Sequence, residues 1–289
     1  MKTTPIFYKN YIAATALFVL GNGVIFLPAY SGENLILSYL LAFASGVIIC
    51  YLSTFLAKFS YGENKSFKAF KIIIFIFLCV FSVYTAAQCF IDFTNFVSEI
   101  MLPSFSKAII NLSFVLTVAF YQFKRQENIL KFSLLAFVGA TVLILLFLLV
   151  LGEEFETKNI SFSFNFKDIF LQSKDYFLSV FLPILILPFY QKKVFKKSDF
   201  KTNFIGLLIG SALLLCCVLT SALLFGGSLT TRLFYPYASA VSTVSVGKLF
   251  TRMDGFSYIL YFVSAITKIN LCIFVCLSAL KETNRLTKK

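Results

Sequence analysis

The sequence contains no histidine and no tryptophan, and only 13% of its 289 residues are charged. Without histidine the chain has no imidazole that could bind a metal or act as a general base. A soluble domain carries roughly 25% charged residues, so this deficit indicates a membrane protein. The sequence also lacks G-x-S-x-G, H-E-x-x-H and phosphate-binding glycine motifs. We therefore expect no enzymatic activity, no cofactor and no metal site.

The residues that are present fit the same class. Hydrophobic residues make up 59% of the chain, and the seven cysteines all lie in apolar stretches without a C-x-x-C pair. We expect them to be free thiols that pack as small apolar side chains. The net charge of +13 comes from lysines at the ends of apolar segments. Lysines there anchor to anionic lipid headgroups, so the charge needs no nucleic-acid partner.

Apolar stretches recur about eight times, each near the 20 residues that a membrane-crossing helix needs. We place the spans near residues 10–30, 34–57, 70–97, 107–123, 130–151, 176–191, 202–226 and 255–280. The connections hold no low-complexity linker, so residues 1–289 are expected to form a single transmembrane domain in an all-α polytopic protein. Lysine and arginine concentrate on the side that holds both chain ends, which predicts cytoplasmic termini.

Two connections on the opposite side are long. Residues 161–166 alternate small polar residues with phenylalanine, which predicts a strand-like or interfacial piece. Residues 238–250 predict a short helix that lies on the outer surface.

The first span contains two glycines and an asparagine at mid-membrane depth, in the run Leu20-Gly21-Asn22-Gly23-Val24. Each glycine costs roughly 1 kcal/mol of helix propensity relative to alanine. Unwound backbone at this depth is tolerated where it is buried in protein or lines a cavity, and transporters use it to bind small ligands. Close packing of helices through small residues is the alternative.

The sixth span carries two prolines, Pro183 and Pro188. Each removes a backbone donor and clashes with the preceding turn. An inverted repeat of five helices places its interrupted members first and sixth, so the two spans together favour a ligand cavity. A simple proline kink is the alternative.

Polar residues recur along one face of the third span, at Gln88, Asp92, Asn95 and Glu99. The eighth span carries Lys268 inside the apolar stretch, with Ser264 and Tyr261 on the same stripe. Ionisable groups inside a membrane face the bundle interior and pair with one another. We therefore hypothesise that Asp92 and Lys268 form a pair, either a structural one or one with a role in proton coupling or signalling.

The chain resembles the spore germination permeases, the B subunits of GerA-type germinant receptors in the amino acid–polyamine–organocation superfamily. The resemblance rests on the order of four short motifs along nearly the whole chain. They are Gly21…Leu27-Pro28, Arg125-Gln126-Glu127-Asn128, Leu187-Pro188-Phe189, and Phe250-x-Arg252-x-Asp254 ahead of Lys268. The chain departs from the family in stopping after an eighth helix of a ten-helix plan. It also carries Ser179 and Phe181 where the family has glycine and glutamate.

The resemblance implies a LeuT-like inverted-repeat bundle, shortened at its C-terminal end, in the spore inner membrane. It implies binding of a small nutrient, typically an amino acid, and partnership with A-type and C-type receptor subunits. The implied ligand-binding positions are Gly21, Asn22, Gly23, Val24, Tyr84, Gln88, Ser179, Phe181 and Pro183. Two alternatives stay open: an amino-acid permease of the same superfamily, and an assembly subunit that binds no ligand.

Overall fold

The computed structural model describes residues 5–21, 23–26, 34–62, 67–123, 126–159, 165–243 and 254–288. These residues form helices joined by turns, without a strand in the described ranges. The helices are α1 Pro5–Leu20, α2 Gly23–Phe26, α3 Leu35–Ser60, α4 Lys68–Phe96, α5 Lys107–Gln122, α6 Gln126–Leu151, α7 Phe166–Tyr176, α8 Leu187–Phe195, α9 Phe200–Thr230, α10 Pro236–Ser242 and α11 Asp254–Thr287. Short π- or 3-10 segments complete them: η3 Val97–Met101, η4 Gly152–Glu154, η5 Thr157–Asn159, η6 Phe177–Phe181 and η7 Leu182–Ile186.

Six helical segments in the described ranges are long and apolar enough to cross a membrane. They are Leu35–Ser60, Lys68–Met101, Asn128–Glu154, Phe166–Phe195, Phe200–Gly227 and Tyr258–Thr287. Of the eight expected spans, the first is divided between α1 and α2, and the fourth is the shorter apolar helix Lys107–Gln122. The expectation of an all-α polytopic membrane protein is confirmed.

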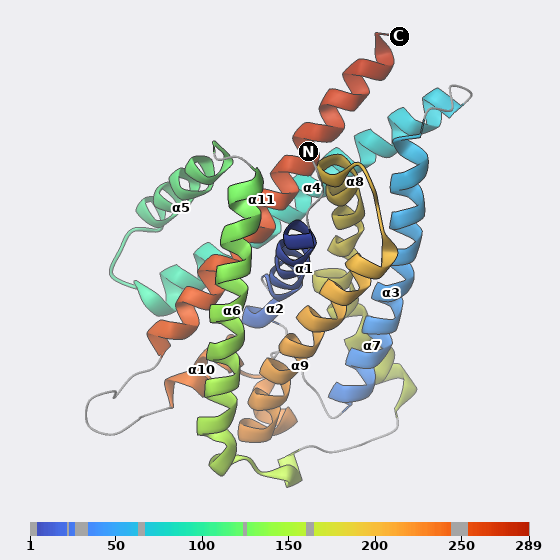
Figure 1. The fold of residues 1–289 in the computed structure, drawn as a ribbon. Helices are drawn as coiled ribbons and strands as arrows, with labels where there is room; N and C mark the ends of the chain where they lie inside the picture. The colour runs from blue at the N-terminus through green and yellow to red at the C-terminus, as the bar shows by residue number, and fades with distance from the viewer. Residues whose placement is uncertain are drawn as a thin grey trace.

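Helix α1 lies at the centre of the bundle (Figure 1) and packs against α9, α6 and α11. Nearly every side chain from Asn10 to Leu20 is buried, which is the pattern of a helix surrounded by other helices. Gly206 and Gly210 on α9 allow the closest approach, since a Cβ at Gly206 would lie 2.6 Å from the Cβ of Thr15. Small residues four apart let two membrane helices pack with their backbones close together.

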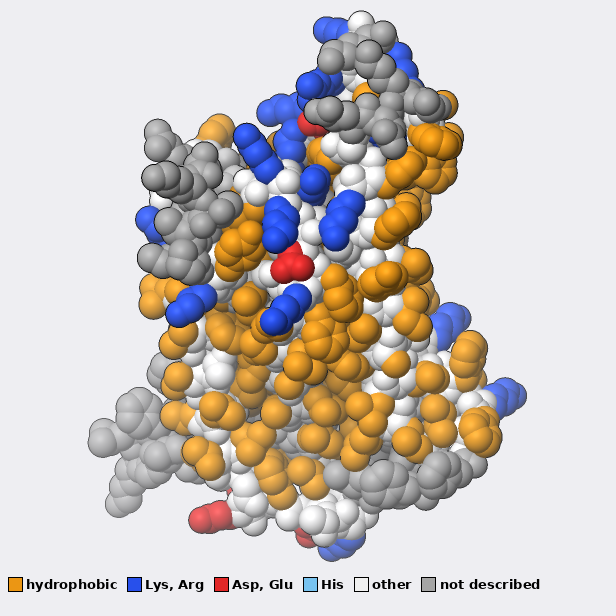
Figure 2. Space-filling view, turned by 45° about the vertical axis from the view of Figure 1, so that its right-hand side comes forward, with side chains coloured by type: hydrophobic (Ala, Val, Ile, Leu, Met, Phe, Trp, Pro, Cys, Tyr) orange, Lys and Arg blue, Asp and Glu red, His pale blue; other side chains and the backbone are white. Residues whose placement is uncertain are grey.

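The outer surface carries a broad apolar band, with lysine and arginine side chains gathered at one end of the molecule (Figure 2). Large apolar side chains on α3, α4, α5 and α6 are exposed around this band. The start of α1 and the end of α11 lie at the same end of the bundle (Figure 1). The protein is therefore built as a multi-pass membrane protein.

The two long connections differ from expectation. Residues 161–164 of the strand-like run expected at 161–166 lie outside the described residues, and Phe166 begins α7. The surface helix expected at 238–250 overlaps α10 as far as Ser242, and residues 244–250 lie outside the described residues. The outer position expected for this helix is corrected at α10. Pro236, Tyr237, Ala238, Ala240 and Val241 are buried, because α10 packs against α9 and α11.

Candidate functional site

The first span is interrupted inside the membrane. Helix α1 ends at Leu20, and Gly21 adopts a φ of +22°, with its N–H donating to Leu17 O at 2.8 Å. A positive φ at the end of a helix suits glycine, which has no Cβ to clash with the preceding carbonyl. Residue Asn22 lies outside the described residues, and the chain resumes as α2 at Gly23. The structure thus confirms the break in the first helix.

Lys268 of α11 lies directly against this break. A Cβ at Gly21 would be 2.5 Å from Lys268 Cδ and 3.3 Å from Lys268 Nζ. The lysine is only 1% exposed, and its Nζ lies 5.3 Å from the centroid of the Phe18 ring. Ser264, one turn earlier on α11, donates to Gly21 O at 3.3 Å. The predicted stripe of Tyr261, Ser264 and Lys268 is therefore buried, and Ser264 and Lys268 face the end of α1.

Asp92 is half-buried on α4, the helix that crosses α11. It lies close enough to Lys268 for an electrostatic interaction. The pairing of Asp92 with Lys268 stays a prediction. Elsewhere on the predicted polar face, Asn95 accepts a hydrogen bond from Lys107, and Tyr235 donates one to Glu99 at 2.7 Å.

The Phe166–Phe195 segment is irregular in its middle. The π-helical turn η6 is followed by the 3-10 turn η7, which carries Pro183 in its first turn, and Pro188 lies in the first turn of α8. These prolines cannot donate to the preceding helical turn, so the hydrogen-bonding pattern changes there. The predicted interruption of the sixth span is confirmed in this form.

The two interruptions meet inside the bundle. A Cβ at Gly23 would lie 2.9 Å from Val180 Cγ2, so the Val180 side chain of η6 packs against the first residue of α2. Val24, which follows Gly23, and Pro183, three residues after Val180, are also buried. Phe181 is also buried and packs on α3, where a Cβ at Gly46 would lie 2.7 Å from its ring. Five of the predicted ligand positions, namely Gly21, Gly23, Val24, Phe181 and Pro183, are thus buried on the two interrupted segments.

The remaining predicted ligand residues lie differently. Ser179 donates to Asp175 O in its own helix. Tyr84 is 63% exposed and Gln88 is also exposed, so both lie on the outward side of α4 and not at the break. At this level the inward side of α4 carries the small residues Ser82, Thr85 and Cys89, and their spacing of three and four residues is the signal that would have identified it.

A buried polar cluster ties α1 to α8 and α9, and the sequence reasoning missed it. Tyr11 Oη lies within hydrogen-bond distance of both Leu187 O and Asn203 Oδ1. Asn203 Nδ2 donates to Gln191 Oε1 at 2.8 Å, and all three side chains are at most 1% exposed. Tyrosine, asparagine and glutamine at similar depth in spans that lie far apart in sequence are the only signal that pointed to this cluster.

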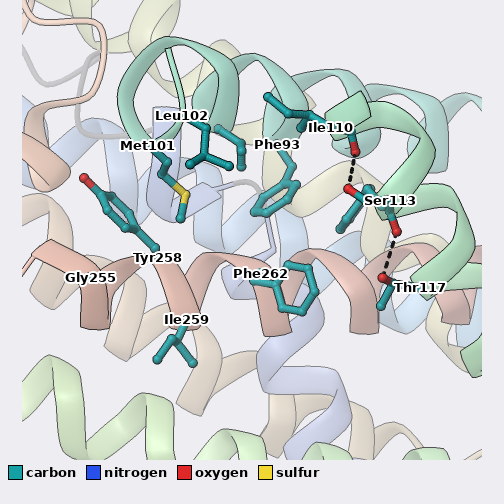
Figure 3. Close-up of a pocket in the computed structure, with 12 residues that line it drawn as sticks. Phe93, Met101, Leu102, Ile110, Ser113, Thr117, Gly255, Tyr258, Ile259 and Phe262 are labelled. Atoms are coloured by element: carbon teal, nitrogen blue, oxygen red, sulfur yellow. Dashed lines mark hydrogen bonds between the residues drawn. The ribbon is translucent and has the colours of Figure 1, made fainter. Parts of the chain in front are cut away.

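Two apolar pockets lie away from the break, between α4, α5 and α11. One has a volume of about 390 Å³ and is lined by Phe93, Met101, Phe114, Tyr258 and Phe262, among others (Figure 3). Its polar residues Ser113 and Thr117 donate to carbonyls of their own helix. The second, of about 480 Å³, is lined mainly by apolar side chains of the same three helices. Such surfaces suit hydrocarbon better than a zwitterionic nutrient.

Most of the family motif before α11 lies outside the described residues. Phe250 and Arg252 lie outside the described residues, and Asp254 begins α11 with its side chain outside them as well. Within the described ranges, no group of three or more acidic, cysteine or histidine side chains is arranged to hold a metal ion.

Together the fold and the break define a class: a polytopic helical membrane protein with two interrupted segments that meet inside the bundle. The chain matches the family described as "Spore germination protein" over residues 6–289, and it belongs to that family. The resemblance inferred from the motifs is thereby confirmed, and the protein is a germination-related, permease-like membrane protein. A search of curated proteins found no match to the chain.

Proposed function

We propose that this protein is a B-type germinant receptor subunit that recognises a small nutrient, such as an amino acid, where its interrupted segments meet. The observation that carries the proposal is the approach of Gly23 to Val180, which brings the start of α2 into contact with a side chain of the irregular turn η6. Interrupted membrane helices present unpaired backbone N–H and C=O groups, and these groups suit the charged ends of an amino acid. A LeuT-like arrangement of the bundle is part of this proposal.

The proposed setting is the inner membrane of the spore, with A-type and C-type subunits as partners. The start of α1 and the end of α11 lie at one end of the bundle, and lysine and arginine gather at that end in Figure 2. By the positive-inside rule this end faces the cytoplasm.

A deletion strain tested on a panel of nutrients examines the proposal directly. Spores that lack the protein should lose germination on at least one nutrient and regain it with the wild-type gene. Gly23→Val should fail to restore the response, because the side chain would displace Val180 and Leu214. Gly139→Val is the matched control on α6, since no atom lies within 4 Å of a Cβ there. The amount of each variant in the spore membrane is measured alongside.

Normal germination of the deletion strain on every nutrient would contradict the receptor role. If the protein is required but Gly23→Val restores germination fully, an assembly subunit that binds no ligand becomes the better account.

An amino-acid permease is the second candidate, and the same contact between interrupted segments favours it. Transporters move such segments against each other to open a central site to either side in turn. Uptake of labelled amino acids into proteoliposomes separates the two candidates. Sustained accumulation supports the permease, whereas saturable binding without accumulation supports the sensor.

A further inference from the structure

Helices α4 and α11 pack side by side and antiparallel along much of their length (Figure 1). The Phe96 ring of α4 meets the Tyr261 ring of α11, with centroids 4.9 Å apart. Further along the same contact, Cys89 Sγ lies 4.0 Å from Ala265 O. Small side chains at such positions let two membrane helices approach closely. The contact continues beyond this point and brings two cysteines together.

Cys79 of α4 and Cys276 of α11 touch through their sulfur atoms. The two Sγ atoms lie 3.0 Å apart, and one S–H donates a hydrogen bond to the other sulfur. Both thiols are free, and both side chains are half-buried. A disulfide bond requires the two sulfurs to lie about 1 Å closer, and rotation of the side chains can supply this shift. The two helices therefore hold a pair of thiols that can be oxidised to a disulfide.

Cys276 can be reached from the lipid side of the molecule. It lines the pocket of about 480 Å³ between α4, α5 and α11, whereas Cys79 is not among the described residues that line it. Val83, Val115 and Leu277 also line this pocket, and about half of each of these side chains is exposed on the outer surface. In a membrane this surface faces hydrocarbon. An apolar molecule dissolved in the bilayer can therefore enter the pocket and meet Cys276 first.

We propose that Cys79 and Cys276 form a modification site, a dithiol that an organic hydroperoxide from the bilayer oxidises to a disulfide. The Cys276 sulfur takes the terminal oxygen of the hydroperoxide and becomes a sulfenic acid, while the O–O bond breaks and the alkoxide leaves with the thiol proton as an alcohol. The Cys79 sulfur then attacks the Cys276 sulfur, and the hydroxyl group leaves with the second thiol proton as water. Two thiols thus lose two electrons in total, and one hydroperoxide is reduced to an alcohol and water.

The pocket and the thiol pair together favour this chemistry. The pocket is lined mainly by apolar side chains, so it admits an oxidant carried on a hydrocarbon, such as a peroxidised acyl chain, more readily than hydrogen peroxide. The second thiol lies 3.0 Å from the first, and this proximity favours capture of the sulfenic acid over its further oxidation. The new bond would join α4 covalently to α11, the helix that carries Ser264 and Lys268 beside the end of α1.

The test uses the full-length protein in its membranes, treated with cumene hydroperoxide. The protein is then denatured, and its free thiols are labelled with N-ethylmaleimide and counted by mass. Wild type should lose two of its seven labelled thiols, and peptide mapping should show Cys79 linked to Cys276. Dithiothreitol should restore both thiols. A protein that keeps all seven thiols, or that links a different pair of cysteines, would overturn the proposal.

Serine variants test the order of the two steps. Cys79→Ser should stop at the sulfenic acid, so dimedone should label Cys276 in this variant. Cys276→Ser should give a several-fold lower yield of dimedone adduct at Cys79, because Cys79 does not line the pocket. Cys216→Ser on α9, which is also half-buried, is the matched control and should keep the link between Cys79 and Cys276. Equal dimedone labelling in the first two variants would overturn the assignment of Cys276 as the first sulfur to react.

Hydrogen peroxide at the same concentration tests the class of oxidant. It should form the disulfide several-fold more slowly than cumene hydroperoxide, and an equal or faster rate would overturn the route through the apolar pocket. If a serine variant cannot be recovered folded, the wild-type peptide map and the comparison of the two peroxides still decide. The inference goes beyond the proposed function and does not depend on it. Its readout is thiol chemistry without nutrient, so it can fail while the germination experiment succeeds, and the reverse is equally possible.

Discussion

Two lysines are buried among the described residues, and each contacts the C-terminal end of another helix. Lys71 Nζ donates to Gly62 O just beyond α3, and Lys268 lies against Gly21 just beyond α1. The first end lies near the lysine-rich end of the molecule and the second inside the bundle. A buried lysine beside a glycine therefore occurs both where α3 ends and where the first span is interrupted after α1.

The local sequence at the two ends is also the same. A phenylalanine precedes each glycine by three residues, and its ring faces the ammonium. The distance from Nζ to the ring centroid is 5.9 Å at Phe59 and 5.3 Å at Phe18. A Phe-x-x-Gly run at a helix end, with a lysine brought in from another helix, thus places an ammonium between a ring and the last carbonyls.

The surroundings make the difference. Beside the end of α3, Lys193 forms an ion pair with Glu282 at 2.6 Å and lies 5.9 Å from the Tyr61 ring centroid. This end therefore has acidic and basic side chains and access to water. At the end of α1, Lys268 lies buried beside Phe18 and Ser264, with Asp92 half-buried on α4 nearby. The comparison predicts that equivalent substitutions cost much more at α1 than at α3.

The largest difference is expected for alanine at the two glycines. Gly21→Ala would force a side chain into a positive φ and against Lys268 Cδ, so we expect a loss of about 2–4 kcal/mol in unfolding free energy. Gly62→Ala meets only Phe59 O and Lys58 O, at 3.2 and 3.4 Å, and should cost under about 1 kcal/mol. Melts of both variants check the order. Equal losses would mean that the two ends are equivalent.

The next difference concerns the lysines themselves. Lys71→Met removes the donor to Gly62 O, but water at this end can replace it, so we expect a loss of about 1 kcal/mol. Lys268→Met should lower the Tm several times more, because the carbonyl end of α1 has no comparable access to water. Side-by-side melts in one buffer test this. A larger loss for Lys71→Met would remove the contrast on which the comparison depends.

A smaller effect is expected for Glu282→Gln. The Lys193 and Glu282 side chains are 32% and 15% exposed, so water screens the pair and its loss should cost about 0.5–1 kcal/mol. The difference from wild type should vanish in 1 M NaCl, where the Debye length is about 3 Å. The effect of Lys268→Met should persist in the same salt. A cost for Glu282→Gln that does not change with salt would show that water does not screen the pair of Lys193 and Glu282.

The sequence predicted the features that depend on a single residue type at depth. Glycines within the first span predicted its break, and prolines predicted the irregular sixth span. Lys268 predicted a buried ionisable side chain. It was harder to predict which side of α4 faces the other helices, because lipid-facing and bundle-facing positions are both apolar in a membrane helix. The resemblance implied Tyr84 and Gln88 as ligand positions, yet Thr85 and Cys89 occupy the inward side. The burial of α10 depends on tertiary packing, which the local pattern does not encode.

The smallest expected effect is a pH dependence at the end of α3. Burial, and then the nearby Glu282 carboxylate, raise the pKa of Tyr61 above its ordinary value of 10. The folded protein therefore keeps this proton at a pH where the unfolded chain has released it. The stability that Tyr61 contributes is complete below about pH 10 and declines as the pH rises toward the folded-state pKa.

Tyr61→Phe should accordingly show a shallower fall in Tm between about pH 9 and 11 than wild type does. Tyr84→Phe, on the exposed side of α4, controls for the loss of a phenol. The relevant measurement is the difference in slope between each variant and wild type, because other groups also titrate in this range. If the Tm of Tyr61→Phe falls with pH as steeply as that of wild type, the Tyr61 phenol does not contribute to the pH dependence at the end of α3. In that case the two lysine-capped helix ends would differ less in their surroundings than the structure indicates.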